Sequence, residues 1–204
     1  MKNGSRLLTL LMVSIGVLAP AGAAVTAPKS ALSMVTGNLT SQPIGHYEFC
    51  QRYREECEIR TRSSAPARVT EHGWSVIRSI NASVNAEIHP MTDMEVFGRE
   101  EYWAYPVDAG DCEDFVLLKR RKLMEAGFSV ADLLITVVRK PDGEGHAILT
   151  MRTSEGDFVL DNLHDEVKPW YQTNYSFLKR QASFDTGRWV TIEDGRDVLV
   201  GATQ

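Results

Sequence analysis

Gly110-Asp111-Cys112-Glu113-Asp114 is the stretch that decides the fold of this chain, because it marks the start of a helix. Asp is a favoured residue at a helix N-cap, and acidic side chains in the first turn suit the positive end of the helix dipole. The pattern therefore predicts a helix that begins at Cys112 and runs to about Ala126. Gly127 follows it as a typical C-terminal cap.

The expected helix has an apolar side and a basic middle. Val116 and Leu123 are seven residues apart, as are Leu117 and Met124, so both pairs lie on the same side of the helix. The basic run 119–122 is expected on a solvated face. The apolar side is the one that would pack on the rest of the fold.

The segments after this helix have the pattern of antiparallel strands. Strands are predicted at 133–139, 146–152, 158–161 and 189–192, with turns at 141–145 and 154–157. The segment 171–183 has no clear pattern. Upstream, Ile77, Ile80, Val84 and Ile88 recur every three or four residues, which predicts a helix over 68–88 that ends before Pro90. The fold class is therefore α+β, with a helix packed on an antiparallel sheet.

The composition is that of a globular protein with one core. The chain has 204 residues, of which 43% are hydrophobic and 24% charged. Its net charge of −5 argues against nucleic acid as a partner, because binding to phosphates needs a basic surface. An acidic surface also suits calcium, which prefers carboxylate ligands.

Residues 1–23 have the pattern of a secretory signal peptide. Lys2 and Arg6 precede an uncharged apolar run over 7–19, and the small residues 21–23 offer a cleavage site. The run is shorter than the about 20 residues of a membrane span, although an uncleaved anchor is the alternative. Cleavage would leave a flexible lead-in over 24–42 and a single domain over 43–204, exported to the periplasm.

The cysteines agree with export. Cys50 and Cys57 are seven positions apart, and a continuous helix of that length would rise by about 10 Å, too far for a disulfide. A bond between them therefore requires the segment to bend. In an oxidising compartment such a bond is favoured over two separate thiols. Cys112 is then unpaired, and an unpaired cysteine in an exported protein needs a chemical reason.

Cys112, His146 and Asp161 supply a thiol, an imidazole and a carboxylate, from a helix start and two later strands. A thiol at a helix N-terminus beside an imidazole can become a nucleophilic thiolate, and a carboxylate can orient the imidazole. The backbone N–H of Cys112 is expected to contribute to an oxyanion hole. Core roles for all three residues, or zinc ligation by them, are the alternatives. No partner is evident in the sequence for His46, His72 and His164.

The acids around the cysteine create a charge problem. Asp111, Glu113 and Asp114 would oppose ionisation of Cys112 unless their charge is neutralised. A cation bound beside the nucleophile would neutralise them. Simple capping of the helix is the other interpretation of the same acids.

A set of short motifs is shared with a known family. The motifs are Phe49-Cys50, Val84-Asn85, Pro90-Met91-Thr92-Asp93, Gly110-Asp111-Cys112-Glu113-Asp114-Phe115, Leu118-Lys119-Arg120, Gly145-His146-Ala147 and Val159-Leu160-Asp161-Asn162-Leu163. With them the chain resembles the bacterial transglutaminase-like cysteine proteinases over roughly residues 43–189. One departure is Phe115, which stands where a Tyr is common in the family.

The resemblance implies a papain/transglutaminase-like fold with Cys112 as nucleophile, His146 as general base and Asp161 as the residue that orients His146. It also implies that Asp111 and Glu113 bind calcium, which would answer the charge problem. Known members are periplasmic proteases that cleave large biofilm adhesins. The resemblance therefore further implies a protein substrate such as a surface adhesin, and an inner-membrane regulator.

The function predicted from the sequence is that of an exported cysteine endopeptidase acting on a cell-surface or periplasmic protein through Cys112, His146 and Asp161. A transglutaminase or amidase is a rival, because it would form the same acyl-enzyme and pass it to another acceptor. A calcium-dependent binding module without catalysis is a second rival. The intact set of three residues counts against the binding module.

Overall fold

The structure is a computed structural model that describes residues 1, 32–62 and 65–193. The helices in these ranges are α1 (Ile44–Arg52), α2 (Arg54–Cys57), α3 (Glu71–Glu87), α4 (Asp93–Phe97) and α5 (Cys112–Glu125), with 3-10 turns η2 (Val130–Asp132) and η3 (Trp170–Gln172). No helix in the described ranges is long and apolar enough to cross a membrane. The predicted signal segment lies outside the described residues, apart from Met1.

A seven-stranded sheet forms one layer of the molecule. Its strands are β1 (Val35–Thr40), β4 (Leu133–Arg139), β5 (Gly145–Thr153), β6 (Gly156–Leu160), β7 (Lys168–Pro169), β8 (Ser176–Ala182) and β9 (Asp185–Glu193). Their order is β1-β9-β8-β4-β5-β6-β7, and every neighbouring pair is antiparallel. A separate two-stranded parallel sheet joins β2 (His89–Pro90) to β3 (Ala109–Gly110).

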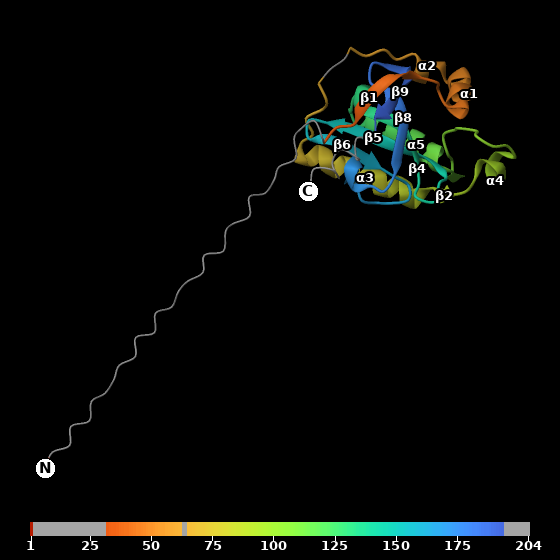
Figure 1. Cartoon of the computed structure of the whole chain (residues 1–204). Coiled ribbons are helices and arrows are strands. Elements are labelled where there is room, and N and C mark those ends of the chain that lie inside the picture. Colours follow the sequence, from red (N-terminus) through yellow and green to blue (C-terminus); the bar gives the residue numbers. More distant parts are fainter. Residues whose placement is uncertain (2–31, 63–64, 194–204) are drawn as a thin grey trace.

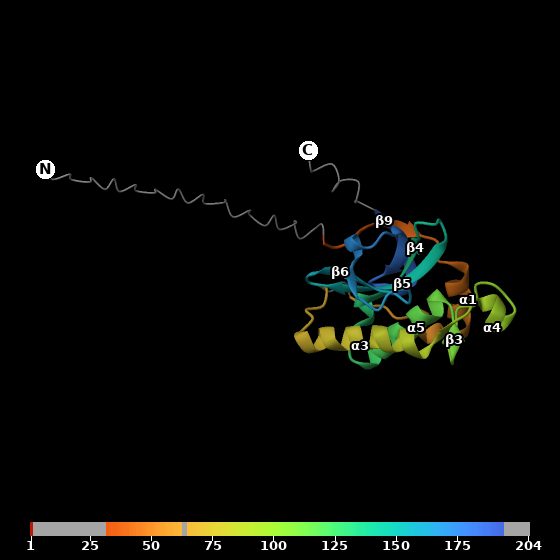
Figure 2. The same ribbon diagram turned by 90° about the horizontal axis from the view of Figure 1, so that it is seen from below.

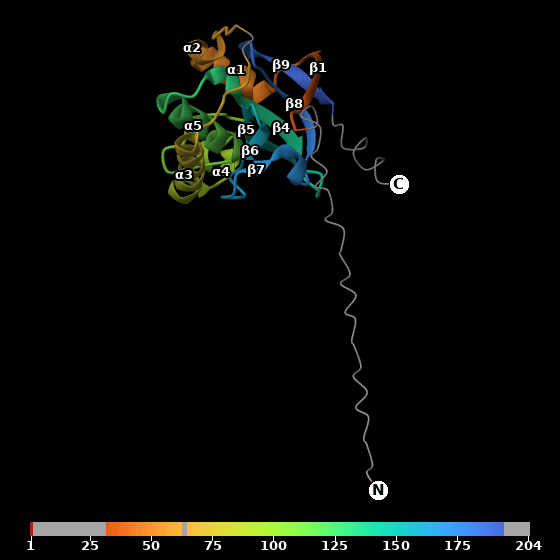
Figure 3. The same cartoon turned by 90° about the vertical axis from the view of Figure 1, so that its left-hand side faces the viewer.

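Helices α3 and α5 cover one face of the large sheet (Figures 1 and 2). Turned by 90°, the molecule shows its helices on one side and its strands on the other (Figure 3). Helix α5 starts directly after β3, so the small sheet sets where its first residue lies. This two-layer arrangement brings the N-terminus of α5 to the interior strand β5, which the helix contacts.

The sheet has a hydrophobic cluster on each face, and a third cluster of Val84, Ile88 and Phe115 joins α3 to α5. The cluster on the helical side includes Val116, Leu117, Leu123, Leu133, Ile135, Leu149 and Met151. The cluster on the opposite face includes Val138, Ile148, Val159, Trp170, Tyr175 and Phe177. Strand β5 contributes to both, because successive side chains of a strand point to opposite faces.

The observed fold confirms the predicted α+β class, and the strands predicted after α5 correspond to β4, β5, β6 and β9. The predicted lead-in over 24–42 is wrong for residues 35–40, which form β1 against β9. Most side chains of β1 are exposed, so this strand has no apolar pattern and is held by backbone pairing at the sheet edge. The segment without a clear pattern contains β8.

The basic run of α5 is only partly solvated, contrary to the prediction. Lys119 and Arg120 are 0% and 2% exposed. Helix α5 packs on α3 as well as on the sheet, which buries more of its circumference than one apolar side. Arg120 donates to Glu56 at 3.2 Å and to the carbonyl of Leu133 at 3.3 Å, which satisfies part of its guanidinium.

Candidate active site

Cys112 is the first residue of α5, and its position is set by a close contact between β3 and the helix. A Cβ atom on Gly110 would lie 2.5 Å from Asp114 Oδ2, so only glycine lets the Asp114 carboxylate come this near. Asp114 Oδ1 in turn accepts the N–H of Ala104 at 2.7 Å. Asp111 stands at the N-cap position as predicted, but its side chain makes no capping hydrogen bond.

The thiol of Cys112 lies against the start of β5. Its Sγ accepts the N–H of Ala147 at 3.3 Å and donates to Glu113 Oε2 at 3.1 Å. Ala147 follows His146 in the chain, so this contact places the thiol beside the predicted base. Burial raises the pKa of the Cys112 thiol well above its usual range, and the negative charges of Glu113 and Asp111 raise it further.

His146 and Asp161 form a buried pair, with Nε2 of the imidazole 2.9 Å from Oδ1 of the carboxylate. The strand register pairs Leu149 with Leu160, so Asp161 follows β6 on the same face as His146 and diagonally across from it. Because Nε2 faces Asp161, Nδ1 is the ring nitrogen that is not engaged by this carboxylate. Among the described residues, the ligand atoms of these three residues do not form a metal-binding cluster, which disfavours the zinc alternative.

Three donors hold the Asp161 carboxylate. Oδ1 accepts the N–H of Leu163 at 3.0 Å in addition to His146, and Oδ2 accepts the hydroxyl of Tyr175 at 2.5 Å. Burial raises the pKa of Asp161, but the hydrogen bonds and charge of His146 and the bonds from Tyr175 and Leu163 outweigh it and leave the pKa below its usual range. Asp161 is therefore ionised at neutral pH.

Sequence reasoning missed Tyr175, because it lies in the segment that had no clear strand pattern. It also missed the role of helix α3. Asn85 Nδ2 donates to the carbonyl of Asp161 at 3.0 Å and to Asp165 Oδ1 at 2.8 Å. Asn81 Nδ2 donates to the carbonyls of His164 and Asp165 at 3.1 and 2.9 Å. The two amides fix the loop that carries Asp161, which gives a physical role to the shared Val84-Asn85 motif.

A second cluster beside the thiol consists of Asp93, Asp111 and Glu113, and one carboxylate oxygen of each lies within 4.8 Å of the other two. Burial and, next, the charge of Asp111 raise the pKa of Glu113 to about 9. Burial also raises the pKa of Asp111 to about 6 and that of Asp93 above its usual range. Asp93 Oδ1 and Asp111 Oδ1 are buried without a hydrogen-bond partner in the described residues.

This acidic cluster fits a hard divalent cation, because it offers several carboxylate oxygens, two of which are buried without a hydrogen-bond partner among the described residues. Asp93 is the first residue of α4, whose start is fixed by a capping box between Thr92 and Glu95. Asp93 lies in the shared motif over 90–93, but the motif by itself does not identify this residue as a ligand. Its nearness to Asp111 depends on the loop between α4 and β3, which sequence spacing does not reveal.

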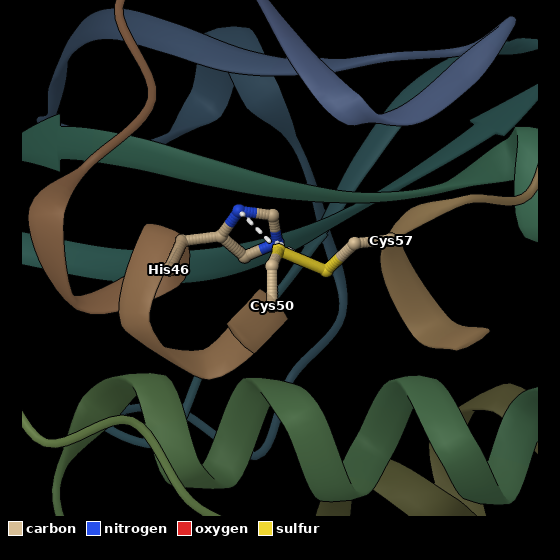
Figure 4. Close-up of side chains that lie close together, drawn as sticks. All are labelled: His46, Cys50 and Cys57. Carbon is tan, nitrogen blue, oxygen red and sulfur yellow. Dashed lines mark hydrogen bonds between the residues drawn. A yellow bond between two sulfur atoms is a disulfide. The ribbon is translucent and has the colours of Figure 1, made fainter. Parts of the chain in front are cut away.

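Cys50 and Cys57 form a disulfide with an S–S distance of 2.08 Å (Figure 4). The required bend lies at Tyr53, which separates α1 from α2. His46 lies beside the disulfide and, contrary to the sequence analysis, has partners: its Nδ1 accepts from Trp189 Nε1 at 3.3 Å. Burial lowers the pKa of His46 to about 3, so the imidazole is a neutral part of the core.

Two cavities flank the thiol. One, of about 420 Å³, is lined by residues that include Trp103, Val137 and Lys179. The other, of about 370 Å³, is lined by residues that include Met91, Lys140 and Leu163. Both also include Cys112, Gly145 and His146 in their walls. The thiol and the imidazole therefore lie between two hollows of a surface groove.

Among solved structures, calcium-bound LapG of Legionella pneumophila has a TM-score of 0.50 and 21% identity, covering 64% of this chain and 80% of that one. EGTA-treated LapG of the same organism has a TM-score of 0.48 and 23% identity, covering 61% and 73%. The first of these likenesses supports the fold. No significant match was found among curated proteins.

The family comparison covers the whole of the site described above. The family described as bacterial transglutaminase-like cysteine proteinase BTLCP matches residues 36–197. The matched range begins within β1 and includes Cys112, His146 and Asp161. It spans well over half of the chain. The chain therefore belongs to the bacterial transglutaminase-like cysteine proteinase family.

Proposed function

We propose that this protein is an exported cysteine endopeptidase in which Cys112 is the nucleophile, His146 the general base and Asp161 the residue that orients His146. The observations that carry the proposal are the hydrogen bond from the N–H of Ala147, the residue after His146, to the Cys112 thiol, and the 2.9 Å distance between His146 Nε2 and Asp161. They support a nucleophile, a base and an orienting acid in one place, which covalent acyl transfer needs.

The proposed reaction has two stages. His146 Nδ1 takes the proton of the Cys112 thiol, the sulfur attacks the peptide carbonyl carbon, and the backbone N–H of Cys112 stabilises the oxyanion. His146 then gives the proton to the leaving amine, which leaves an acyl thioester. Water, deprotonated by His146, hydrolyses the thioester and restores the thiol. Asp161 stabilises the imidazolium in both stages.

The shape of the groove favours a polypeptide over a small amide as the substrate. A bound chain can occupy the hollow on each side of Cys112 while its scissile bond lies at the sulfur. A third cavity of about 490 Å³ shares Lys140 and Leu163 with the second and extends the groove further. By family analogy, the substrate is an adhesin or another cell-surface protein in the periplasm, and an inner-membrane protein regulates its cleavage.

We further propose that Asp93, Asp111 and Glu113 hold a calcium ion, as suits their buried oxygens and the calcium-bound state of the LapG neighbour. Bound calcium would supply positive charge that neutralises these acids. Glu113 accepts the thiol hydrogen of Cys112 in the structure, and it disfavours the thiolate. A Glu113 carboxylate committed to a cation would leave the thiol proton to His146.

Calcium binding can be tested without any activity. The melting temperature of the protein should rise on addition of calcium, because a ligand that binds only the folded state stabilises it. The rise should be lost in Asp93→Asn and kept in the matched surface variant Asp142→Asn, whose side chain is exposed. An equal rise in both variants, or none in the native protein, would contradict this cation site.

The protease proposal is tested by a mass-spectrometric census of new protein N-termini at the cell surface and in the medium. Cells with the native protein are compared with cells carrying Cys112→Ala, with calcium and with a chelator. We expect N-termini that depend on Cys112 and that decline under chelation, and their sequence names the substrate. Identical sets of N-termini in both strains would count against an endopeptidase.

A further inference from the structure

Tyr175 makes a short hydrogen bond to the acid of the candidate triad. Its hydroxyl lies 2.5 Å from Asp161 Oδ2, while Oδ1 of the same carboxylate faces His146. The two oxygens are therefore held by different partners. A carboxylate fixed at both oxygens cannot rotate about its last bond without breaking a hydrogen bond, so Oδ1 stays directed at the imidazole.

The ring of Tyr175 is itself fixed by packing. It is 6% exposed and belongs to the cluster with Trp170 and Phe177 on the face of the sheet away from the helices. Its centroid is 5.6 Å from that of His146, so it also borders the imidazole directly. Burial and the nearby Asp161 raise the pKa of Tyr175 above its usual range, which keeps the hydroxyl protonated as a donor.

The other groups around Asp161 do not replace this contact. Leu163 N–H binds Oδ1, the oxygen that already faces His146. Lys119 of α5 acts on Asp161 through its charge, and it makes no hydrogen bond within the described residues. Oδ2 thus depends on Tyr175 among the described residues.

We propose that Tyr175 is a positioning residue of the active site, which holds the Asp161 carboxylate in the orientation that supports His146 and so governs the reactivity of Cys112. This inference rests on the proposed function and adds a fourth residue to it. Packing alone would need only the ring of Tyr175. The proposed role needs its hydroxyl, so Tyr175→Phe separates the two.

Tyr105→Phe is a matched control, because Tyr105 forms a tyrosine–carboxylate pair elsewhere in the fold. Its hydroxyl is 2.6 Å from Glu56 Oε1, and that pair is partly buried. The main readout is the rate at which iodoacetamide alkylates Cys112 at one neutral pH with calcium present, followed by intact mass. It requires no substrate. The second readout is the imidazole N–H resonance of His146 in protein labelled with ¹⁵N-histidine, and melting temperatures report on folding.

We expect Tyr175→Phe to alkylate roughly threefold to tenfold more slowly than the native protein, since a hydrogen bond to a charged group is lost. The His146 N–H resonance should shift or broaden, and Tyr105→Phe should leave both readouts unchanged. In an Asp161→Asn background, Tyr175→Phe should add little further loss, because its effect passes through Asp161.

Native alkylation and an unchanged His146 resonance in Tyr175→Phe would overturn the proposal if Asp161→Asn slows alkylation. The proposal is also overturned if Tyr175→Phe slows alkylation by the same factor in the native protein and in the Asp161→Asn background. If Asp161→Asn and His146→Ala alkylate at the native rate, the triad itself is wrong and this inference falls with it. A failure confined to Tyr175→Phe leaves the proposed function standing.

Discussion

Lys119 carries a buried amino group for which the described residues offer no hydrogen bond. Burial lowers its pKa to about 7 from an ordinary 10.5, while the charges of Asp161 and Asp165 raise it. The sequence pattern of the helix predicts that this lysine is exposed to solvent, because a charged residue is rarely buried without a partner. Burying this amino group near the loop that carries Asp161 therefore lowers the free energy of unfolding of the protein.

The titration of Lys119 predicts a pH-dependent stability. Between pH 7 and about 10.5 the folded protein binds fewer protons at this site than the unfolded chain, so the free energy of unfolding rises with pH. Lys119→Met lacks this rise, which is at most about 1.4 kcal/mol per pH unit. Denaturant unfolding at pH 7 and 9 should therefore show that the free energy of unfolding of Lys119→Met, relative to that of the native protein, falls as the pH rises. Lys122→Met on the surface of the same helix is the control, and parallel curves for Lys119→Met and native protein would contradict the account.

A second prediction for a single residue concerns the charge of Asp161. Asp161→Asn keeps the shape of the side chain but removes the charge that supports the imidazolium. We expect kcat/KM for peptide cleavage to fall by about 10²- to 10⁴-fold, the range typical of proton-transfer groups. The circular dichroism spectrum should be retained. Activity within threefold of native would show that Asp161 does not orient His146.

At the scale of elements, the junction between β3 and α5 sets the position of Cys112. In Gly110→Ala the added methyl would lie 2.5 Å from Asp114 Oδ2, so the helix start must move. We expect the free energy of unfolding to fall by about 1–3 kcal/mol, as for other overpacked sites. Gly145→Ala is the control in denaturant melts, because a Cβ there meets nothing within 4 Å. Equal stability of the two variants would contradict the role given to Gly110.

Elements with a strong local pattern could be predicted from the sequence, and those held by pairing alone could not. Helix α5 and strands β4, β5 and β6 carry apolar runs and turn residues, and the structure has them at nearly the predicted bounds. Strand β1 exposes most of its side chains, and β8 has register irregularities against both neighbours. Strand β1 depends on β9, and β8 depends in part on β4, both remote in the sequence, and a local pattern does not contain such pairings.

The candidate site divides in the same way. Cys112, His146 and Asp161 could be named because each lies in a short motif with recognisable chemistry. Asp93 begins the short helix α4 and Tyr175 directly precedes β8, and only the fold brings them to the site. Their side chains gain significance from what they contact, so neither composition nor spacing could have shown them.

For the molecule as a whole, the disulfide joins the N-terminal helices to one another beside the core. Removal of both cysteines in Cys50→Ser, Cys57→Ser frees a short loop in the unfolded chain, which should lower the free energy of unfolding by about 2–3 kcal/mol. Chemical denaturation without reductant measures this loss. A double variant as stable as the native protein would mean that the bond adds nothing to the fold.

The same double variant should keep the reactivity of Cys112 once folded, because Cys50 and Cys57 contact His46 and make no hydrogen bond to Cys112, His146 or Asp161. The contribution of the disulfide to stability is thus expected to be independent of the reactivity of Cys112. Alkylation of the single remaining thiol, followed by intact mass, checks this separation.

The most direct measurement of the central claim is the cleavage of a mixture of denatured proteins by the purified protein. Denatured periplasmic and surface proteins are incubated with the native protein, Cys112→Ala or His146→Ala in the presence of calcium, and new termini are identified by mass spectrometry. The account predicts new termini with the native protein that are absent with both variants. Cleavage that survives in Cys112→Ala would contradict it. So would the absence of cleavage by native protein that is shown to have bound calcium and to have a reduced Cys112.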